Sequence, residues 1–238
     1  MILMKISVII PAYNEEERIA RTLSEYRSYL SRSFSSYELI AVDDGSADGT
    51  ERVIRAADGV RCVSYAENRG KGYAVRQGVL RADGDYIFYT DADLSYSPEN
   101  IGAAMRLFEQ GADGVVGVRA DKRHDYPPLR RLGSAAVEYI AQKMLKTSVR
   151  DTQCGFKAFE GRTAKEVFSR SEMCGFGFDL EIISLCESLG KRLAELPVRF
   201  SHRSASRISP ISDGTAILRD ICRLAVRKKR ENARRERM

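Results

Sequence analysis

The sequence predicts an α/β domain in which a mostly parallel, Rossmann-like sheet carries helices on both faces. Short apolar segments rich in β-branched residues, such as Tyr37–Val42, alternate with segments whose apolar residues recur at helical spacing. Strands and helices that alternate along a chain form parallel sheets covered by crossover helices. The length of 238 residues suits one large α/β domain or two small ones, with ample material for a buried core.

The first half of the chain shows the alternation clearly. Its first strand is a β-branched run stopped by Pro11, and the helix that follows has Ile19, Leu23, Tyr26 and Leu30 at helical spacing. The expected strands are Lys5–Ile10, Tyr37–Val42, Arg61–Tyr65 and Asp85–Thr90, and the expected helices are Glu15–Leu30, Asp48–Ala57, Gly72–Ala82 and Pro98–Gln110.

The second half is less regular. A basic stretch, Arg123–Arg131, contains Pro127-Pro128 and is expected to be a mobile loop. The remaining expected elements are a strand at Gly114–Val118, a helix at Ser134–Lys146, a turn and strand within Asp151–Phe159, a helix at Phe178–Leu189, a strand at Leu196–Phe200 and a helix from Gly214 onward.

Composition bounds the class of protein. Hydrophobic residues make up 43% and charged residues 30%, and no run of 18 apolar residues occurs. The apolar start, Met1–Ile10, lacks the basic region and cleavage site of a signal peptide, so we expect a strand there. The five cysteines are irregularly spaced without a CxxC, which favours reduced thiols in a cytoplasmic compartment over disulfides or a zinc site.

The net charge of +6 comes entirely from the end of the chain. Residues 219–238 hold nine Lys or Arg and three Asp or Glu, and the rest is neutral. Ile217, Ile221 and Leu224 fall on one helical face ahead of the basic run 227–230. This segment can lie on an anionic membrane surface, or pack on the domain with a frayed charged end. A neutral domain without a nucleic-acid motif argues against a nucleic-acid partner.

Three polar clusters follow strand ends. They are Tyr13-Asn14-Glu15, Asp43-Asp44 and Asp91-Ala92-Asp93. Ligands of open α/β sheets bind at the carboxyl ends of the strands, so the clusters are expected to share one edge. Two carboxylates one residue apart can both bind Mg²⁺ or Mn²⁺, which prefer oxygen ligands and often bridge phosphates. Alone, such a triplet is more often an exposed acidic turn; its place directly after the expected strand Asp85–Thr90 raises the odds of a metal site.

Other features are weaker. Asp43–Thr50 has the residues of a strand-to-helix turn, and one of its aspartates is expected to bond a base or ribose as well. Lys71, between two glycines, is a candidate phosphate contact, although no P-loop or GxGxxG motif is present. His124 and His202 are far apart in the sequence, so they are expected to be surface residues rather than a metal-binding pair. No GxSxG or Cys/His signature of nucleophilic catalysis occurs. Cations near the expected site, each of which can also be ordinary basic surface, are Arg119, Arg123, Arg130, Arg131 and Lys157.

Taken together, four segments resemble the family 2 glycosyltransferases, which have the GT-A fold. They are Val8–Ile19 (VIIPAYNEEERI), Val42–Thr50 (VDDGSADGT), Asn68–Gly78 (NRGKGYAVRQG) and Asp85–Ser95 (DYIFYTDADLS), in the matching order and spacing. Further along, Asp151–Phe159 (DTQCGFKAF) and Gly175–Ile182 (GFGFDLEI) are similar to the branch that glycosylates polyprenyl phosphates, and within it to the dolichyl-phosphate glucose and mannose synthases.

The resemblance implies an inverting, metal-dependent hexosyltransferase that uses UDP-glucose or GDP-mannose. It implies a nucleoside pocket lined by Pro11, Tyr13 and Glu15, with Asp44 on the base or ribose, and Asp91 and Asp93 on the Mg²⁺ or Mn²⁺ and the diphosphate. It implies an acceptor-phosphate site of Arg119, Arg130, Ser134 and Lys157, with Arg207 at a related basic position. It puts Asp179 and Glu181, with Asp93, at the reacting centre.

The resemblance also suggests one catalytic domain over residues 1–215, with the nucleotide-sugar part in about 1–120 and the acceptor part in about 120–215. The basic tail 216–238 would reach the cytoplasmic face of a membrane. Two departures are Ser95, where some mannose synthases have a metal-binding Gln, and the lack of transmembrane helices found in many relatives. Alternatives are a polysaccharide, diacylglycerol or sugar acceptor, a nucleotidyltransferase, and a non-catalytic nucleotide-sugar-binding protein.

Overall fold

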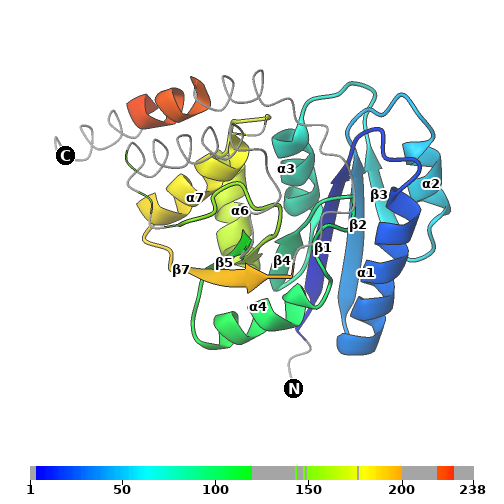
Figure 1. The fold of residues 1–238 in the computed structure, drawn as a ribbon, viewed down its shortest axis with the longest axis horizontal. Helices are drawn as coiled ribbons and strands as arrows, with labels where there is room; N and C mark the ends of the chain where they lie inside the picture. The colour runs from blue at the N-terminus through cyan, green and yellow to red at the C-terminus, as the bar shows by residue number, and fades with distance from the viewer. Residues whose placement is uncertain are drawn as a thin grey trace, which may run out of the picture.

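A computed structural model describes residues 4–119, 143, 147, 149–175, 177–199 and 219–227 (Figure 1). Its strands are β1 (Ile6–Ala12), β2 (Tyr37–Asp43), β3 (Val60–Ser64), β4 (Tyr86–Tyr89), β5 (Gly114–Arg119), β6 (Lys157–Glu160) and β7 (Leu193–Val198). Its helices are α1 (Ile19–Ser33), α2 (Thr50–Ala56), α3 (Lys71–Arg81), α4 (Asn100–Glu109), α6 (Gly161–Arg170) and α7 (Phe178–Ser188), and residues 219–227 are also helical.

The described strands form one sheet in the order β3-β2-β1-β4-β6-β5-β7. All pairs are parallel except those of β6, which runs antiparallel to both β4 and β5. The start of β6 therefore lies beside the ends of its neighbours, and Lys157 is the register partner of Tyr89. The prediction of a mostly parallel sheet is confirmed.

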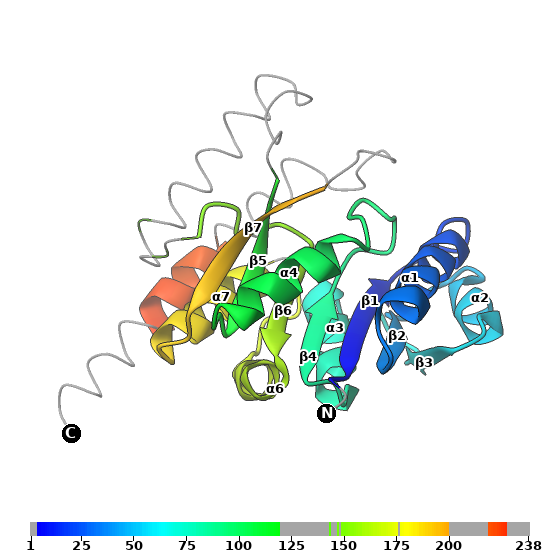
Figure 2. The same cartoon turned by 90° about the horizontal axis from the view of Figure 1, so that it is seen from below.

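Helices cover both faces of the sheet (Figures 1 and 2). Along β1, Ile6, Val8 and Ile10 point into a core shared with α1, α2 and α4, whereas Ile9 points into a second core shared with α3, α6 and α7. This alternation is the period-2 pattern of a strand buried on both sides. The predicted helical layers are thus confirmed.

Some boundaries differ from the sequence-based expectation. Helix α1 begins at Ile19 rather than at Glu15, and the amides of Glu15 and Glu16 donate to Thr50 Oγ1 and Asp48 Oδ2 after β2. Strand β7 begins earlier, at Leu193, and it tolerates Pro197 because it is the edge strand of the sheet. Helix α6 was not predicted.

The C-terminal helical segment packs on the domain. Ile221 is fully buried and Leu224 is 5% exposed, so the predicted apolar face is used for packing. Of the two interpretations of this segment, the structure favours the packed helix for residues 219–227. Within the described ranges, no helix is long and apolar enough to cross a membrane. The predicted helix at 134–146 lies almost wholly outside these ranges.

Candidate active site

The polar clusters after β1 and β2 are joined by direct hydrogen bonds. The amide of Asn14 donates to Ser46 Oγ over 2.9 Å, and the amide of Ala47 donates back to Asn14 Oδ1 over 2.8 Å. Asn14 has a positive φ of 53°, a conformation that asparagine tolerates better than most residues. The loops therefore form one connected rim at the carboxyl edge of the sheet, where the sequence placed them.

Asp44 is the anchor of a loop. Its side chain is buried, and its two carboxylate oxygens accept four hydrogen bonds from the segment 65–70. The donors are Tyr65 Oη at 2.7 Å, Asn68 Nδ2 at 3.0 Å and the amides of Arg69 at 3.0 Å and Gly70 at 2.9 Å. Four bonds fill the ordinary capacity of a carboxylate. Asp44 therefore shapes the loop, and its expected bond to the base or ribose stays a prediction.

Asp43, the last residue of β2, is also buried. Its carboxylate accepts hydrogen bonds from the hydroxyl and the amide of Ser46. Burial raises the pKa of Asp43, and the bonds from Ser46 oppose that rise only in part. Nearby, Pro11 is buried within β1, Tyr13 is 44% exposed, and Glu15 forms an ion pair of 2.6 Å with Arg18. Of the residues expected at the nucleoside pocket, Tyr13 is the most open to a ligand.

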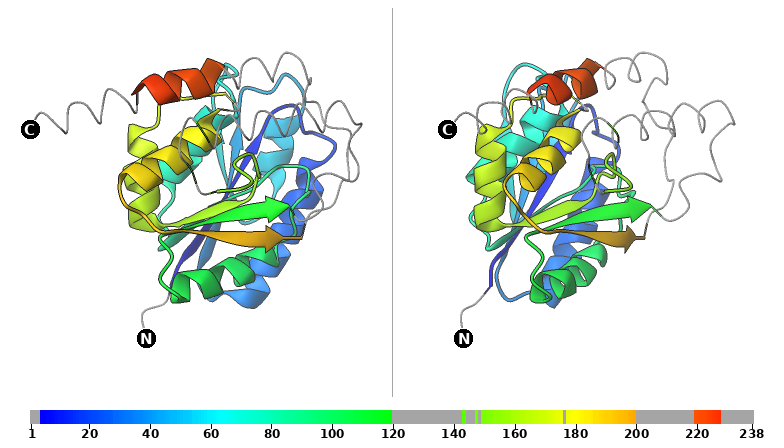
Figure 3. Two further views of the ribbon diagram at one scale, coloured as in Figure 1. Left: turned by 60° about the vertical axis from the view of Figure 1, so that its left-hand side comes forward. Right: turned by 90° about the vertical axis from the view of Figure 1, so that its left-hand side faces the viewer.

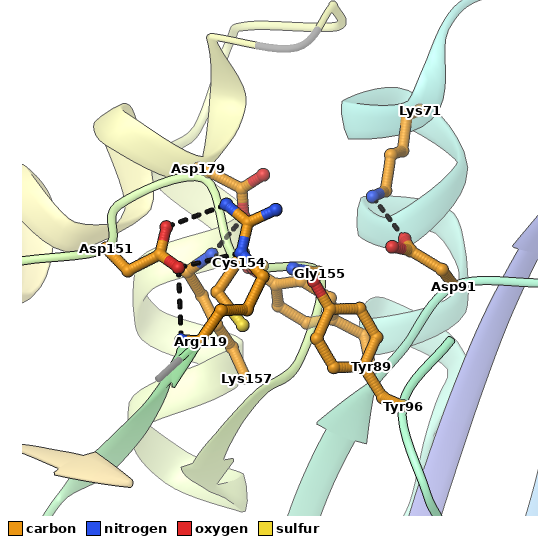
Figure 4. Close-up of polar contacts among 10 residues, drawn as sticks. All are labelled: Lys71, Tyr89, Asp91, Tyr96, Arg119, Asp151, Cys154, Gly155, Lys157 and Asp179. Carbon is orange, nitrogen blue, oxygen red and sulfur yellow. Dashed lines mark hydrogen bonds and ion pairs between the residues drawn. The ribbon is translucent and has the colours of Figure 1, made fainter. Parts of the chain in front are cut away.

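Lys71 and Asp91 form an ion pair across the rim (Figure 4). Lys71 Nζ lies 2.5 Å from Asp91 Oδ1, and the two side chains are 23% and 29% exposed. Burial by itself would lower the pKa of Lys71, but the negative charges of Asp91 and then Asp179 outweigh it and raise the pKa. The ammonium of Lys71 therefore keeps its positive charge at neutral pH, next to the carboxylate of Asp91.

Hydrogen bonds from helix α1 hold the turn at Asp91–Asp93 and the residues after it in place. Thr22 of α1 donates to the carbonyl of Ala92 over 2.6 Å, and Tyr26 donates to the carbonyl of Tyr96 over 2.9 Å. Asp93 Oδ1 accepts the amide of Ser95, and the intervening Leu94 has a φ of 56°. A bulky residue in the left-handed region persists only where its surroundings determine it, which is common at ligand sites.

The segment 151–157 packs directly on Asp91. A Cβ on Gly155 would overlap the Asp91 carboxylate, so a larger residue there would displace that side chain. The amide of Gly155 donates to Tyr96 Oη over 2.9 Å (Figure 4). The two segments that the sequence assigned to donor and acceptor are therefore in contact at this point.

Asp179 lies at the start of α7 with two buried donors. Its Oδ1 accepts from Lys157 Nζ at 2.6 Å and from Tyr89 Oη at 2.8 Å. Burial raises the pKa of Tyr89 well above its ordinary value, as does Asp179, so the phenol remains a donor. Neither bond uses Oδ2 of Asp179.

Lys157 is a buried lysine beside Asp179. It has no solvent exposure, and its ammonium also donates to the carbonyl of Cys154 over 2.7 Å. Its ammonium therefore contacts Asp179 rather than solvent, and the expected role of Lys157 at the acceptor phosphate stays a prediction. Arg119 is paired as well, with two bonds of 2.8 and 2.9 Å to Asp151. Burial would lower the pKa of Arg119, but Asp151 more than offsets this and raises it.

Glu181 is oriented away from this group. Its side chain is 1% exposed, Oε2 accepts the amides of Glu172 and Met173, and Oε1 lies 2.9 Å from Arg227 Nη1. Both oxygens are thus occupied by protein groups, and the expected place of Glu181 at the reacting centre stays a prediction. Arg130, Ser134 and Arg207, expected at the acceptor phosphate, lie outside the described residues.

Comparison with known proteins identifies the family. The model of the family described as "Glycosyl transferase family 2" matches residues 7–168. The chain belongs to this family. The expected GT-A fold and the expected enzyme class, a glycosyltransferase, are thereby confirmed.

Relatives and solved structures agree with this assignment. The family 2 glycosyltransferase is 32% identical to a dolichyl-phosphate beta-glucosyltransferase of Drosophila melanogaster, over 94% of this chain and 75% of that protein. It is 29% identical to the human protein of the same name, over 87% of this chain and 70% of that one. A glucosyl-3-phosphoglycerate synthase of Mycobacterium tuberculosis, solved with Mn²⁺, UDP-glucose and phosphoglyceric acid, superposes with a TM-score of 0.71 at 23% identity, covering 93% of this chain and 80% of that one.

The residues present fit a divalent cation that shares its ligands with phosphate. Asp91 and Asp93 supply partly exposed carboxylates in one turn, the oxygen donors that Mg²⁺ and Mn²⁺ prefer. No group of three or more His, Cys, Asp or Glu able to hold a metal occurs among the described residues. Mg²⁺ is commonly bound through one or two carboxylates with phosphate and water completing its shell, which matches this donor set.

Sequence reasoning missed three residues that organise the site. Tyr89 was assigned only to a strand, Asp151 only to a turn, and Arg227 only to a basic run. For Asp151 a signal existed, since it begins the segment that carries the acceptor resemblance. For Tyr89 and Arg227 the partners lie 90 and 46 residues away, and no local pattern marks them.

Proposed function

We propose that this glycosyltransferase transfers a hexose, with inversion, from a nucleotide-sugar to a polyprenyl phosphate, and that UDP-glucose is the donor. The observation that carries the proposal is the contact between Asp91 and Gly155. It brings the turn expected to bind the donor diphosphate against the segment that resembles polyprenyl-phosphate transferases. The similar proteins named dolichyl-phosphate beta-glucosyltransferase support the same acceptor and sugar.

The chemistry requires no strong general base. A phosphate monoester has a second pKa of about 6, so an acceptor phosphate is already ionised at neutral pH. One of its oxygens attacks the anomeric carbon as the bond from that carbon to the nucleoside diphosphate breaks. A cation held by Asp91 and Asp93 would supply charge stabilisation for the departing diphosphate. Lys71, kept protonated beside Asp91, adds a positive charge at the same place.

Asp179 is proposed to face the reacting sugar. Its Oδ1 is fixed by Lys157 and Tyr89, and its negative charge helps to raise the pKa of Lys71. Arg119, with Arg130, Ser134 and Arg207, is proposed to hold the acceptor phosphate. Tyr13, Pro11 and Glu15 are proposed to line the nucleoside pocket.

The test is transfer to a short polyprenyl phosphate with Mg²⁺ or Mn²⁺, comparing UDP-glucose with GDP-mannose. We expect a glucolipid from UDP-glucose, and Asp93→Ala should lower turnover by at least about 100-fold, since a metal contributes several kcal/mol. Asp58→Ala is the matched control, because Asp58 is an exposed aspartate in the turn between α2 and β3, where it pairs with Arg27. Near-normal turnover of Asp93→Ala would refute the account. Nucleotide binding without a glycolipid from either donor would exclude the lipid acceptor.

A cytoplasmic, membrane-peripheral location is part of the proposal. Because Ile221 and Leu224 pack on the domain, attraction to anionic lipid would come from the basic residues after Arg227, at about 1 kcal/mol for each one near the surface. Flotation with anionic and with neutral vesicles tests this, using the full chain and a chain that ends at Arg227. Equal flotation of the two chains on anionic vesicles would count against the basic tail.

A further inference from the structure

The helix 219–227 lies against the loop that precedes α7. In Figures 1 and 3 this red helix runs beside the yellow α7. Ile221 and Leu224 are buried, and a Cβ on Gly177 would overlap the side chain of Asp220. The helix therefore sits directly on the backbone that leads into Phe178 and Asp179.

Arg227, in the last described turn of this helix, carries the charged part of the contact. Its Nη1 lies 2.9 Å from Glu181 Oε1 and 3.4 Å from Glu172 Oε2. Glu181 is 1% exposed, so its negative charge is balanced inside the protein, chiefly by Arg227. The other oxygen of Glu181 accepts the amides of Glu172 and Met173, at 2.9 and 2.8 Å. Glu181 thus joins the helix to the segment 172–175.

The segment 172–175 in turn rests on the start of α3. The carbonyl of Cys174 accepts the amide of Gly72 at 2.7 Å and that of Tyr73 at 3.4 Å. A Cβ on Gly70, which has a φ of 93°, would lie 2.5 Å from that carbonyl oxygen. Both glycines beside Lys71 are therefore packed against this segment. The series of contacts that begins at Arg227 therefore reaches Lys71, whose ammonium pairs with Asp91.

We propose that Arg227 is a positioning residue for the transferase: by pairing with Glu181 it fixes the segment 172–175, and through it the placement of Lys71 and Asp179. This inference rests on the proposed function for its catalytic meaning. Without Arg227, none of the described ion pairs leaves a cation against the buried Glu181, which favours a turn of the carboxylate toward water. The amides of Glu172 and Met173 then lose their acceptor, and the backbone over Gly70–Gly72 loosens.

The test compares three variants. Arg227→Gln removes the charge, Arg227→Lys retains it, and Arg223→Gln removes a charge from the same helix at a side chain that is 70% exposed. Hydrogen–deuterium exchange of the Gly72 and Tyr73 amides is measured without ligand, and UDP affinity with Mn²⁺ is measured by calorimetry. Arg227→Gln should speed that exchange and weaken UDP binding by about tenfold, as such couplings of 0.5–2 kcal/mol allow. Arg227→Lys should recover most of both, and Arg223→Gln should change neither.

The outcomes separate this inference from the proposed function. Unchanged exchange at Gly72 and Tyr73 in Arg227→Gln overturns the inference, even if the protein transfers sugar. A lower melting temperature with uniform exchange changes and unchanged UDP affinity also overturns it, because the role is then only structural. If the wild type neither binds UDP nor transfers sugar, the proposed function fails, and the exchange result alone decides the positioning role of Arg227.

Discussion

The carboxylates at the end of β2 and those in the second half of the sheet are both buried, but they are balanced differently. Asp43 and Asp44 accept hydrogen bonds from hydroxyl, amide and backbone N–H groups. Asp151, Asp179 and Glu181 each face the side chain of an Arg or Lys. Removing one neutral donor costs a carboxylate a single hydrogen bond. Removing one partner of a buried ion pair leaves the other charge buried without compensation.

The largest expected effect is at the buried pair Lys157–Asp179. Lys157→Met leaves the Asp179 carboxylate buried without a cation, so the free energy of unfolding should fall by about 3–5 kcal/mol in urea denaturation. Lys191→Met is the control, because its partly exposed pair with Glu166 should contribute less than about 1 kcal/mol. The double variant Lys157→Met/Asp179→Leu should regain much of the loss. Equal losses in Lys157→Met and Lys191→Met would contradict the difference between buried and partly exposed ion pairs.

A smaller loss is expected at Asp44. Asp44→Asn keeps the size of the side chain but replaces one acceptor oxygen with a donor, which faces the donors of the segment 65–70. Unfolding stability should fall by about 2 kcal/mol, the cost of donors left without acceptors. Exchange should quicken at the Arg69 and Gly70 amides, while Asp58→Asn at an exposed aspartate should leave both readouts unchanged. Unaltered exchange at these amides would argue against the anchor role.

The smallest effect is a pH dependence at Asp43. Burial raises its pKa in the folded protein, so the folded state binds the proton more tightly than the unfolded chain does. The contribution of Asp43 to stability should therefore rise as the pH falls from about 7 toward about 4, the ordinary pKa of an aspartate. The difference in melting temperature between the wild type and Asp43→Asn should move in favour of the wild type over this range. A constant difference, or the opposite trend, would refute it.

The sequence predicted those features of the fold that local residue patterns determine. The strands around Val8 and Ile40 follow from β-branched runs, and the shared edge of three polar clusters follows from parallel topology. Helix α6 was missed because its buried apolar residues are only Ala164, Val167 and Phe168 in a polar segment. The antiparallel strand β6 was expected as a strand, but its place between β4 and β5 was not.

The sequence predicted which residues form the site better than it predicted what each of them does. Lys71 and Asp91 do meet at the carboxyl edge, as the parallel topology leads one to expect. The partners of buried charges are set by three-dimensional packing, so the pairing of Lys157 with Asp179 and of Glu181 with Arg227 was not predicted. Motif resemblance marks a residue as needed without stating whether it touches the substrate or holds the residue that does.

The position of β6 has a consequence for synthesis on the ribosome. Strand β5 follows β4 in the chain but does not pair with it, because β6 lies between them. A nascent chain therefore cannot complete the sheet until residues 157–160 have emerged, and until then β4 presents an open edge. Such long-range strand insertion slows folding and prolongs the time in which that edge can pair with a wrong partner. Chaperone contact during synthesis should accordingly be strongest before this short strand appears.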